Sequence, residues 1–389
     1  MAVDLRYSAA KTSKITKRLF NTSPIKKIQQ DLKRKLPSQV KYTQNLAKTN
    51  NAKKTEERLV PSDYNVQLDY QLSEKEDIMV AIETISSNLW SESSTLHTKY
   101  YGLVDKRDRD MESLVFSLKG LSMKAKAEAM KFRTNQFPKD MVTTTQLYTV
   151  YEHQGNTFVD RKLEINIRNG NLRKFVITNA SPVISRTVQK FQLGKVTYGH
   201  ENMEVIIPAK SYESMIKDKI KALELDISNA TEKNPTLEFE LSALKKFHTF
   251  VMANPTALYV DLNEMTYEEL SSLIGYGFVT LTSNHLNEIE SHQFSISYPA
   301  CGVFLKLINA GRVWLVKAMA KASYKESLEE NLFKKWEGMT LNGESKMNNF
   351  RAPFYGYDLN WVLADALGSG LIEVFNTPVG RGWKLTGKA

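Results

Sequence analysis

The sequence predicts an α+β protein, mainly helical, with three tandem winged-helix domains after a disordered basic N-terminal tail. Helical spacing of apolar residues gives way to strand-like alternation and turn residues three times along the chain. The 389 residues accommodate two or three domains. We divide the chain into a tail (1–65), a first unit (66–205), a second unit (206–298) and a third unit (299–389), each unit being an expected winged-helix domain.

The tail accounts for the net charge of the protein. Residues 1–60 contain 15 Lys and Arg against 4 Asp and Glu, a net charge of +11, which leaves −1 for the other 329 residues. The tail is rich in Lys, Ser, Thr, Asn and Gln and poor in aromatic residues. Because such a segment buries too little apolar surface to offset the entropy of ordering it, we expect it to be disordered.

Several uses of this tail remain open. It can bind nucleic-acid phosphates, form a nuclear import signal around Lys33-Arg34-Lys35, or serve only to keep the protein soluble. It can also be a mitochondrial presequence, because residues 5–30 contain no acidic residue. Ser23-Pro24 resembles a proline-directed kinase site, so Ser23 is a candidate phosphorylation site, where a phosphate would add up to about two negative charges.

In the first unit, helices are expected to precede strands. Ser73 and Glu76 form a capping box ahead of an apolar helical pattern, and a second helix is expected over 111–132. Alternation with turn residues then predicts strands over 147–151, 157–167 and 172–177.

The second and third units repeat this order of helices followed by a hairpin. Thr266 and Glu269 form a capping box, and Gly277 follows the helix that they begin. In the second unit we expect helices over 211–226, 237–252 and 266–273, then strands over 278–281 and 294–298. In the third unit we expect helices over 303–324, 328–336 and 358–367, then strands over 371–376 and 383–385.

No catalytic constellation is found in the sequence. It contains no glycine-rich phosphate loop, no GxSxG and no HExxH, and the single cysteine, Cys301, excludes an intramolecular disulfide and a multi-cysteine zinc site. His285 and His292 are better explained as loop residues than as metal ligands. We therefore expect no catalytic residue, metal or cofactor, and no membrane partner, since no stretch approaches about 18 uninterrupted apolar residues.

A basic surface is expected on the third unit. No acidic residue occurs from Ser291 to Lys325, and Lys317, Lys321 and Lys325 would share one side of the helix expected there. Such a surface can follow the phosphates of double-stranded DNA, with a merely solvated helix face as the alternative. The residues expected to contact DNA are Lys306, Arg312, Lys317, Lys321, Lys325, Lys334, Lys335, Arg351, Arg381 and Lys384.

The last helix of the third unit is not expected to read bases. In helix-turn-helix docking this helix enters the major groove, but here it contains Asp358 and Asp365 and no Lys or Arg, and its counterpart in the second unit carries Glu268 and Glu269. Binding through the DNA backbone with low sequence specificity is therefore expected. The first unit can add the cations Lys119, Lys124, Lys126, Lys131 and Arg133.

Short motifs in the second and third units resemble the family labelled serine/threonine-protein kinase nineteen. The resemblance is strongest over 270–385, weaker over 145–270 and absent from the tail. It is carried by Tyr276-Gly277-Phe278-Val279-Thr280-Leu281, Phe294-Ser295-Ile296-Ser297-Tyr298-Pro299, Gly302-Val303-Phe304-Leu305-Lys306, Gly311-Arg312, Lys321-Ala322-Ser323-Tyr324-Lys325-Glu326, Phe354-Tyr355-Gly356-Tyr357-Asp358-Leu359 and Gly370-Leu371-Ile372-Glu373-Val374. An earlier match is Gly170-Asn171-Leu172-Arg173-Lys174-Phe175.

The resemblance implies a nuclear protein of three winged helices that binds double-stranded DNA. In the animal members the implied role is a scaffold in transcription-coupled nucleotide-excision repair, linking the stalled RNA polymerase II complex to the helicase-bearing repair factor. The long basic tail and the long 338–353 loop depart from the short animal proteins.

Two other functions are kept as alternatives. The first is a winged-helix subunit that binds proteins and not DNA. The second is a protein kinase, as the family label suggests, but the chain lacks the glycine-rich loop, the HRD-type loop and the DFG Asp that a kinase requires. Arg107-Asp108 has neither the preceding His nor the following Asn.

Overall fold

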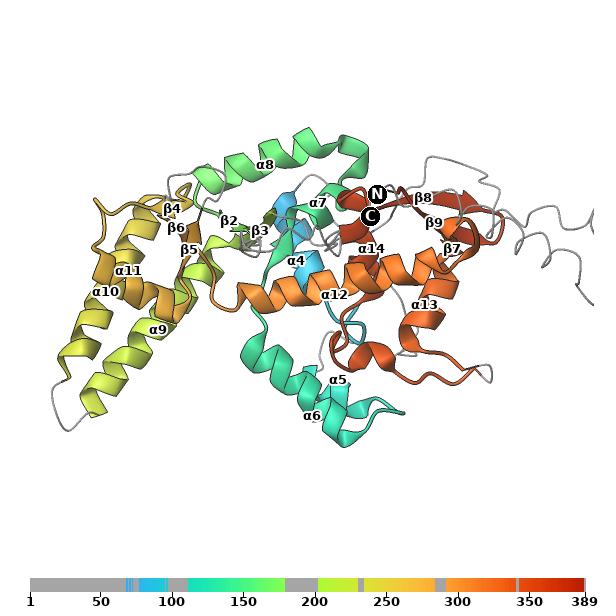
Figure 1. Ribbon diagram of the computed structural model, residues 1–389, viewed down its shortest axis with the longest axis horizontal. Coiled ribbons are helices and arrows are strands. Elements are labelled where there is room, and N and C mark those ends of the chain that lie inside the picture. The colour runs from blue at the N-terminus through green and yellow to red at the C-terminus, as the bar shows by residue number, and fades with distance from the viewer. Residues whose placement is uncertain are drawn as a thin grey trace, which may run out of the picture. The chain divides into compact units, whose positions relative to one another are not determined.

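The computed structural model describes residues 68, 70, 72, 77–94, 96, 111–178, 202–229, 234–283, 292–340 and 343–387, and Figure 1 shows their elements. The tail with Ser23, the expected capping box at Ser73 and Glu76, and Arg107-Asp108 lie outside these residues. Residues 60–389 form one compact unit. The described part is mainly helical with three small antiparallel sheets, which confirms the α+β class.

The described elements of the first unit begin with helices and end with a hairpin (Figure 1). Asp77 caps the first of them. The elements are α4 (Ile78–Ser87), α5 (Met111–Ser117), α6 (Met123–Lys131), a π-helical turn (Phe132–Gln136), β1 (Val142–Thr143), α7 (Thr144–Val150), a 3-10 turn (Glu152–Gln154), α8 (Asn156–Arg168), β2 (Leu172–Thr178) and β3 (Asn202–Pro208).

The strands expected over 147–151 and 157–167 are wrong, because these segments are the helices α7 and α8. Thr143 and Gln146 form a capping box that begins α7. In α8 the buried residues Val159, Leu163 and Ile167 recur every four positions, which is a helical period. The expected strand over 172–177 is confirmed as β2, whereas the helix expected over 111–132 is divided into α5 and α6.

The second unit follows its expected order closely. Thr266 and Glu269 form the expected capping box of α11, and Gly277 ends that helix in the left-handed conformation with φ of 80°. The elements are α9 (Ala209–Asn229), α10 (Pro235–Ala253), β4 (Tyr259–Val260), α11 (Tyr267–Tyr276), β5 (Val279–Ser283) and β6 (His292–Ile296).

The third unit also has its expected helices and strands, but its first helix is shorter than expected. That helix, α12, ends at Ala320 and not at 324. The elements are α12 (Cys301–Ala320), a 3-10 turn (Ser323–Lys325), β7 (Glu326–Leu328), α13 (Glu329–Glu337), a second 3-10 turn (Asn348–Phe350), α14 (Leu359–Gly368), β8 (Ile372–Thr377) and β9 (Gly380–Leu385).

The three sheets share one topology. Each is antiparallel, and its third strand in sequence lies between the first and the second: β1-β3-β2, β4-β6-β5 and β7-β9-β8. The first strand of each sheet is only two or three residues long, and the other two form a hairpin with pairs such as Phe175↔Val205, Leu281↔Phe294 and Val374↔Trp383. The same arrangement therefore occurs once in each unit.

A single hydrophobic cluster extends through all three units. It includes Leu147 of α7, Phe247 of α10 and Trp361 of α14, all fully buried. Arg173 of β2 joins the first unit to the second: its guanidinium donates hydrogen bonds to carbonyl oxygens of Val251, Asn254 and Ala257 at 3.0, 3.4 and 3.2 Å. Because carbonyls at a helix C-terminus carry partial negative charge, Arg173 stabilises the end of α10.

Candidate nucleic-acid interface

The exposed side of α12 carries lysines and no acidic residue. Lys306 and Lys317 are eleven residues apart, and since about 3.6 residues make one helical turn, their side chains lie on the same side of α12. Both are exposed, whereas Phe304 and Leu315 are buried in the core. Within the described ranges, neither lysine takes part in an ion pair. This side of α12 therefore presents uncompensated positive charge.

The basic residues continue beyond the end of α12, but not on one helical face. Lys321 is the C-cap of α12 and Lys325 ends the following 3-10 turn, so the expectation that Lys317, Lys321 and Lys325 share one side of a helix is wrong. All three side chains are nevertheless exposed. We call the exposed side chains of Lys306, Lys317, Lys321 and Lys325 the basic stripe.

The other residues of the third unit that are expected to contact DNA differ in whether they form ion pairs with acidic residues. Lys335 and Arg351 are exposed and, among the described residues, take part in no ion pair. The remaining three are paired. The ion pairs are Lys334–Glu330 at 2.7 Å, Arg381–Glu329 at 3.3 Å and Lys384–Glu326 at 3.7 Å.

Arg312 lies in the core, so the expectation that it contacts DNA is wrong. Its side chain is 1 % exposed, and its Nε and Nη2 atoms donate to the two carboxylate oxygens of Asp365 at 2.5 and 2.8 Å. Burying a guanidinium requires such a partner, because an unpaired charge in the core is strongly unfavourable. Charge counting along the sequence missed this pair because its members are 53 residues apart.

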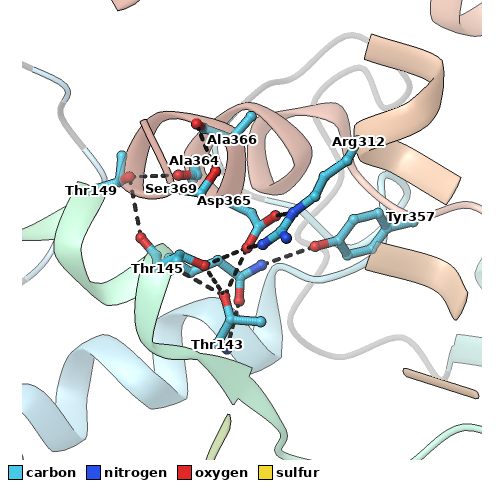
Figure 2. A network of polar contacts seen from close by, with 10 residues as sticks. Thr143, Thr145, Thr149, Arg312, Tyr357, Ala364, Asp365, Ala366 and Ser369 are labelled. Atoms are coloured by element: carbon cyan, nitrogen blue, oxygen red, sulfur yellow. Dashed lines mark hydrogen bonds and ion pairs between the residues drawn. The ribbon is translucent and has the colours of Figure 1, made fainter. Parts of the chain in front are cut away.

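Asp365 is the centre of a buried polar network that joins α14 to the first unit (Figure 2). The hydroxyls of Thr143 and Thr145 donate to its Oδ1 atom at 3.2 and 2.5 Å. Burial alone would raise the pKa of Asp365, but the charge of Arg312 and these hydrogen bonds hold it below its ordinary value. The carboxylate is thus ionised, fully occupied and inaccessible to a substrate.

The helix that a winged helix would place in the major groove is itself packed against protein. Along α14, residues 361–366 are buried, and α14 contacts α7 of the first unit. The Thr149 hydroxyl donates to the carbonyl oxygen of Ala364 at 2.5 Å (Figure 2). This helix is therefore unavailable for reading bases.

Replacing Gly368 with alanine is expected to destabilise the contact between α14 and α7. A Cβ atom at Gly368 would lie 1.9 Å from the carbonyl oxygen of Thr145, and relieving such a backbone clash costs about 1–3 kcal/mol. Gly275→Ala in α11 is the control, because a Cβ atom there meets nothing within 4 Å and removing a helical glycine adds roughly 0.5–1 kcal/mol. Urea unfolding of both variants measures the difference; equal stabilities would contradict the packing described.

The basic residues of the first unit divide into exposed and structural ones. Lys126 is buried and donates to the carbonyl oxygen of Phe116 at 2.8 Å. Arg133 is buried in an ion pair with Glu92 and donates to the carbonyl oxygen of Tyr355. Exposed side chains remain at Lys119, Lys124 and Lys131.

Arg351 and Lys124 are brought to one cavity, although they belong to different units. The cavity has a volume of about 310 Å³. Its lining includes Ala125 and Glu128 of α6 and Phe350 and Tyr355 of the long loop before α14. No sequence pattern predicts this contact, which depends on the packing of Leu118, Leu121, Met347 and Phe350.

The described residues contain no group of three or more His, Cys, Asp and Glu side chains that could hold a metal ion. Cys301 is partly exposed, and its Sγ atom lies 3.4 Å from the Ser297 hydroxyl. In the part of the chain that the structure describes, no helix has the length and hydrophobicity of a membrane span. What the third unit presents is a stripe of cations suited to a polyanion.

The described residues form an α+β protein whose third unit carries a stripe of exposed lysines. The family model described as inactive serine-threonine protein kinase 19 matches residues 111–385, so the chain belongs to that family. A relative in Schizosaccharomyces pombe, named serine/threonine-protein kinase mug51, is 25% identical over 264 residues, which cover 67% of this chain and 72% of the relative. The family description calls its members inactive, whereas the relative is named a kinase.

Proposed function

We propose that the protein is a non-enzymatic, nuclear winged-helix scaffold that binds the backbone of double-stranded DNA, in transcription-coupled nucleotide-excision repair or in transcription. The observation that carries this proposal is the basic stripe, in which Lys306, Lys317, Lys321 and Lys325 are exposed without an acidic partner in the described part of the chain. Four such lysines together can displace counterions from neighbouring phosphates.

The three units are proposed to be winged-helix domains bounded as 66–205, 206–298 and 299–389, after a disordered tail over 1–65. Support comes from the repeated order of a short strand, one or two helices and a hairpin, with the third strand between the other two. Limited proteolysis of the full chain tests the tail boundary, which should be the first site cut.

Sequence-independent binding follows from the position of the helices. In the third unit α14 is buried against α7, and in the second unit α11 has Glu268 and Glu269 in its first turn. Neither helix suits the major groove, so contacts to phosphates would position the protein without selecting a sequence.

Charge reversal in the basic stripe is expected to weaken duplex binding strongly. Lys317, Lys321 and Lys325 changed together to Glu should reduce affinity roughly 10- to 100-fold near 0.15 M salt and lower the slope of log K against log salt by about 2–3, one step for each lost phosphate contact. Fluorescence anisotropy with a labelled duplex across a salt series measures both quantities.

The matched control carries the same charge change elsewhere. Lys217, Lys221 and Lys245 are exposed on α9 and α10 of the second unit, and their replacement by Glu should leave most of the affinity and slope intact. Equal losses in the two triple variants would mean that net charge, and not the basic stripe, governs binding. Full affinity in the stripe variant would refute the proposed interface.

The repair assignment and the partners rest on the family resemblance. The chain belongs to the family described as inactive, and we propose a scaffold that links RNA polymerase II to repair-factor complexes. A kinase assay with highly purified protein tests this role, because a scaffold should transfer no phosphoryl group.

Purification of the tagged protein from cells should recover polymerase or repair subunits. Residues 1–60 fused to a fluorescent protein should enter the nucleus; import into mitochondria would support the alternative.

A protein-binding role is the second candidate, and the second unit supplies the observation that favours it. Exposed apolar side chains occur at Tyr259, Leu262, Tyr267 and Leu281, between 45 % and 66 % exposed. Large exposed apolar residues in one region are typical of partner contacts. If the full chain binds no duplex DNA at low salt, this candidate replaces the DNA proposal.

A further inference from the structure

Tyr324 is an exposed aromatic residue in the middle of the basic stripe. Its side chain is 48 % exposed, and it lies in the 3-10 turn between α12 and β7, with Lys321 three positions before it and Lys325 directly after it. Both lysine side chains are exposed. Tyr324 thus stands between two exposed lysines along a surface segment without an acidic residue between 292 and 325.

The backbone that presents Tyr324 is strained. Tyr324 and Lys325 have φ values of 58° and 57°, so two consecutive non-glycine residues adopt the left-handed conformation. This conformation is unfavourable for residues with a Cβ atom, and strained residues of this kind are concentrated at functional sites. The sequence keeps Tyr and Lys at positions where glycine or asparagine would be easier to accommodate.

The surroundings of Tyr324 distinguish it from other exposed aromatic side chains in the described part of the chain. Phe239 lies between Glu238 and Glu240, and Tyr267 precedes Glu268. Tyr259 is followed by Asp261. Glu326 also stands two positions after Tyr324, but its side chain is only 7 % exposed and its Oε1 atom lies 3.7 Å from the Nζ atom of Lys384. Exposed carboxylates repel a nucleic acid, so of these aromatic residues Tyr324 has the neighbourhood that suits one best.

Cations beside an aromatic ring form the combination that binds unpaired nucleotides. A base stacks on the ring because every base has a π-face, while lysines contact the adjoining phosphates. In a continuous duplex the bases are already stacked on one another, so an exposed ring adds little there. The combination therefore favours DNA that has an unpaired base next to a duplex.

We propose that Tyr324 stacks on an unpaired base, with Lys321 and Lys325 on the neighbouring phosphates, so that the protein prefers junctions between double- and single-stranded DNA over continuous duplex. This inference rests on the proposed DNA-binding function and names its ligand: the duplex part lies along Lys306 and Lys317 of α12, and the unpaired base lies at Tyr324.

The test compares two DNA probes with the full-length protein. One is a blunt duplex, and the other is the same duplex with a short single-stranded tail that carries 2-aminopurine at its first unpaired position. The wild-type protein should bind the tailed probe about tenfold more tightly than the blunt one and should quench the 2-aminopurine fluorescence by stacking. Tyr324→Ala should remove both the preference and the quenching but keep the affinity for the blunt duplex.

Three further variants separate stacking from structural effects. Tyr324→Phe keeps the ring and should behave as wild type. Tyr324→Gly relieves the left-handed strain, so it should raise the melting temperature of the protein. The same variant should abolish the preference for the tailed probe. If Tyr324 had only a structural role, stability and affinity for the tailed probe would change in the same direction. Phe239→Ala, which removes an exposed ring between two acidic residues, should leave the preference and the quenching unchanged.

The result that overturns this inference differs from the one that overturns the proposed function. If Tyr324→Ala retains the tenfold preference or the quenching, or if the wild-type protein shows no preference, Tyr324 is not a stacking residue, whatever the affinity for duplex. If charge reversal of the basic stripe leaves duplex binding unchanged, the proposed interface fails even when Tyr324 affects the tailed probe.

Discussion

Replacing Arg312 with methionine is expected to lower the free energy of unfolding by about 3–5 kcal/mol, because the carboxylate of Asp365 would remain buried without its counter-charge. Asp365 is 1 % exposed, and Arg312 provides its only ion pair in the described part of the chain. The hydroxyls of Thr143 and Thr145 would still donate to it, but two neutral donors do not replace a cation. Urea denaturation followed by circular dichroism measures the change.

The double variant Arg312→Met with Asp365→Leu tests whether the loss arises from the stranded charge. Replacing a whole buried pair by apolar side chains is often neutral or stabilising, so the double variant should recover most of the stability. Lys306→Met, an exposed lysine on the same helix, should leave stability within about 0.5 kcal/mol of wild type. An Arg312→Met variant as stable as Lys306→Met would contradict the buried pair.

A loss of similar size, about 3–5 kcal/mol, is expected from Arg133→Met in the first unit. The carboxylate of Glu92 is fully buried, and Arg133 is its partner. Arg133 also lies over the ring of Trp90 at 4.2 Å and donates from Nε to the carbonyl oxygen of Tyr355 at 2.8 Å. The variant thus removes the counter-charge, a cation–π contact and a bond to the long loop of the third unit.

Lys131→Met is the matched control for this second prediction. Lys131 is two residues away and exposed, so its replacement should change stability by less than about 0.5 kcal/mol. Thermal unfolding of both variants gives the comparison. Should Arg133→Met melt at the wild-type temperature, the ion pair with Glu92 would contribute nothing to the fold.

Much of the secondary structure was predictable because its signals are local. The capping box of Thr266 and Glu269 and the glycine at 277 identified α11, and turn residues identified the hairpins of β5–β6 and β8–β9. α7 was missed because four of its seven residues are β-branched, among them Thr144, Thr145 and Thr149. α8 was missed because its β-branched residues, Thr157, Val159, Ile165 and Ile167, stand at alternating positions, as in a strand. Such residues favour strands on average, but packing against α14 and the core overrides that preference here.

The candidate interface was predictable only in part. A run of sequence without acids identifies a surface of one charge, which is why Lys306 and Lys317 were found. It cannot show that a charge lies in the core, because the partner can be far away in the sequence: Arg312 is paired with Asp365, and Arg133 with Glu92. Helical spacing also did not predict that α12 ends at Ala320, which places Tyr324 in a strained turn.

The packing of α14 against the first unit also determines whether a chain truncated before α14 can fold properly. Trp361 donates to the carbonyl oxygen of Asn88 and stacks on Tyr70, and Thr149 donates to Ala364. A premature stop codon within the last third of the gene would therefore remove partners from the first unit, leaving part of its core open to water. Quality-control proteases remove such chains. Late truncating alleles should accordingly behave as complete losses, not as proteins that lack one function.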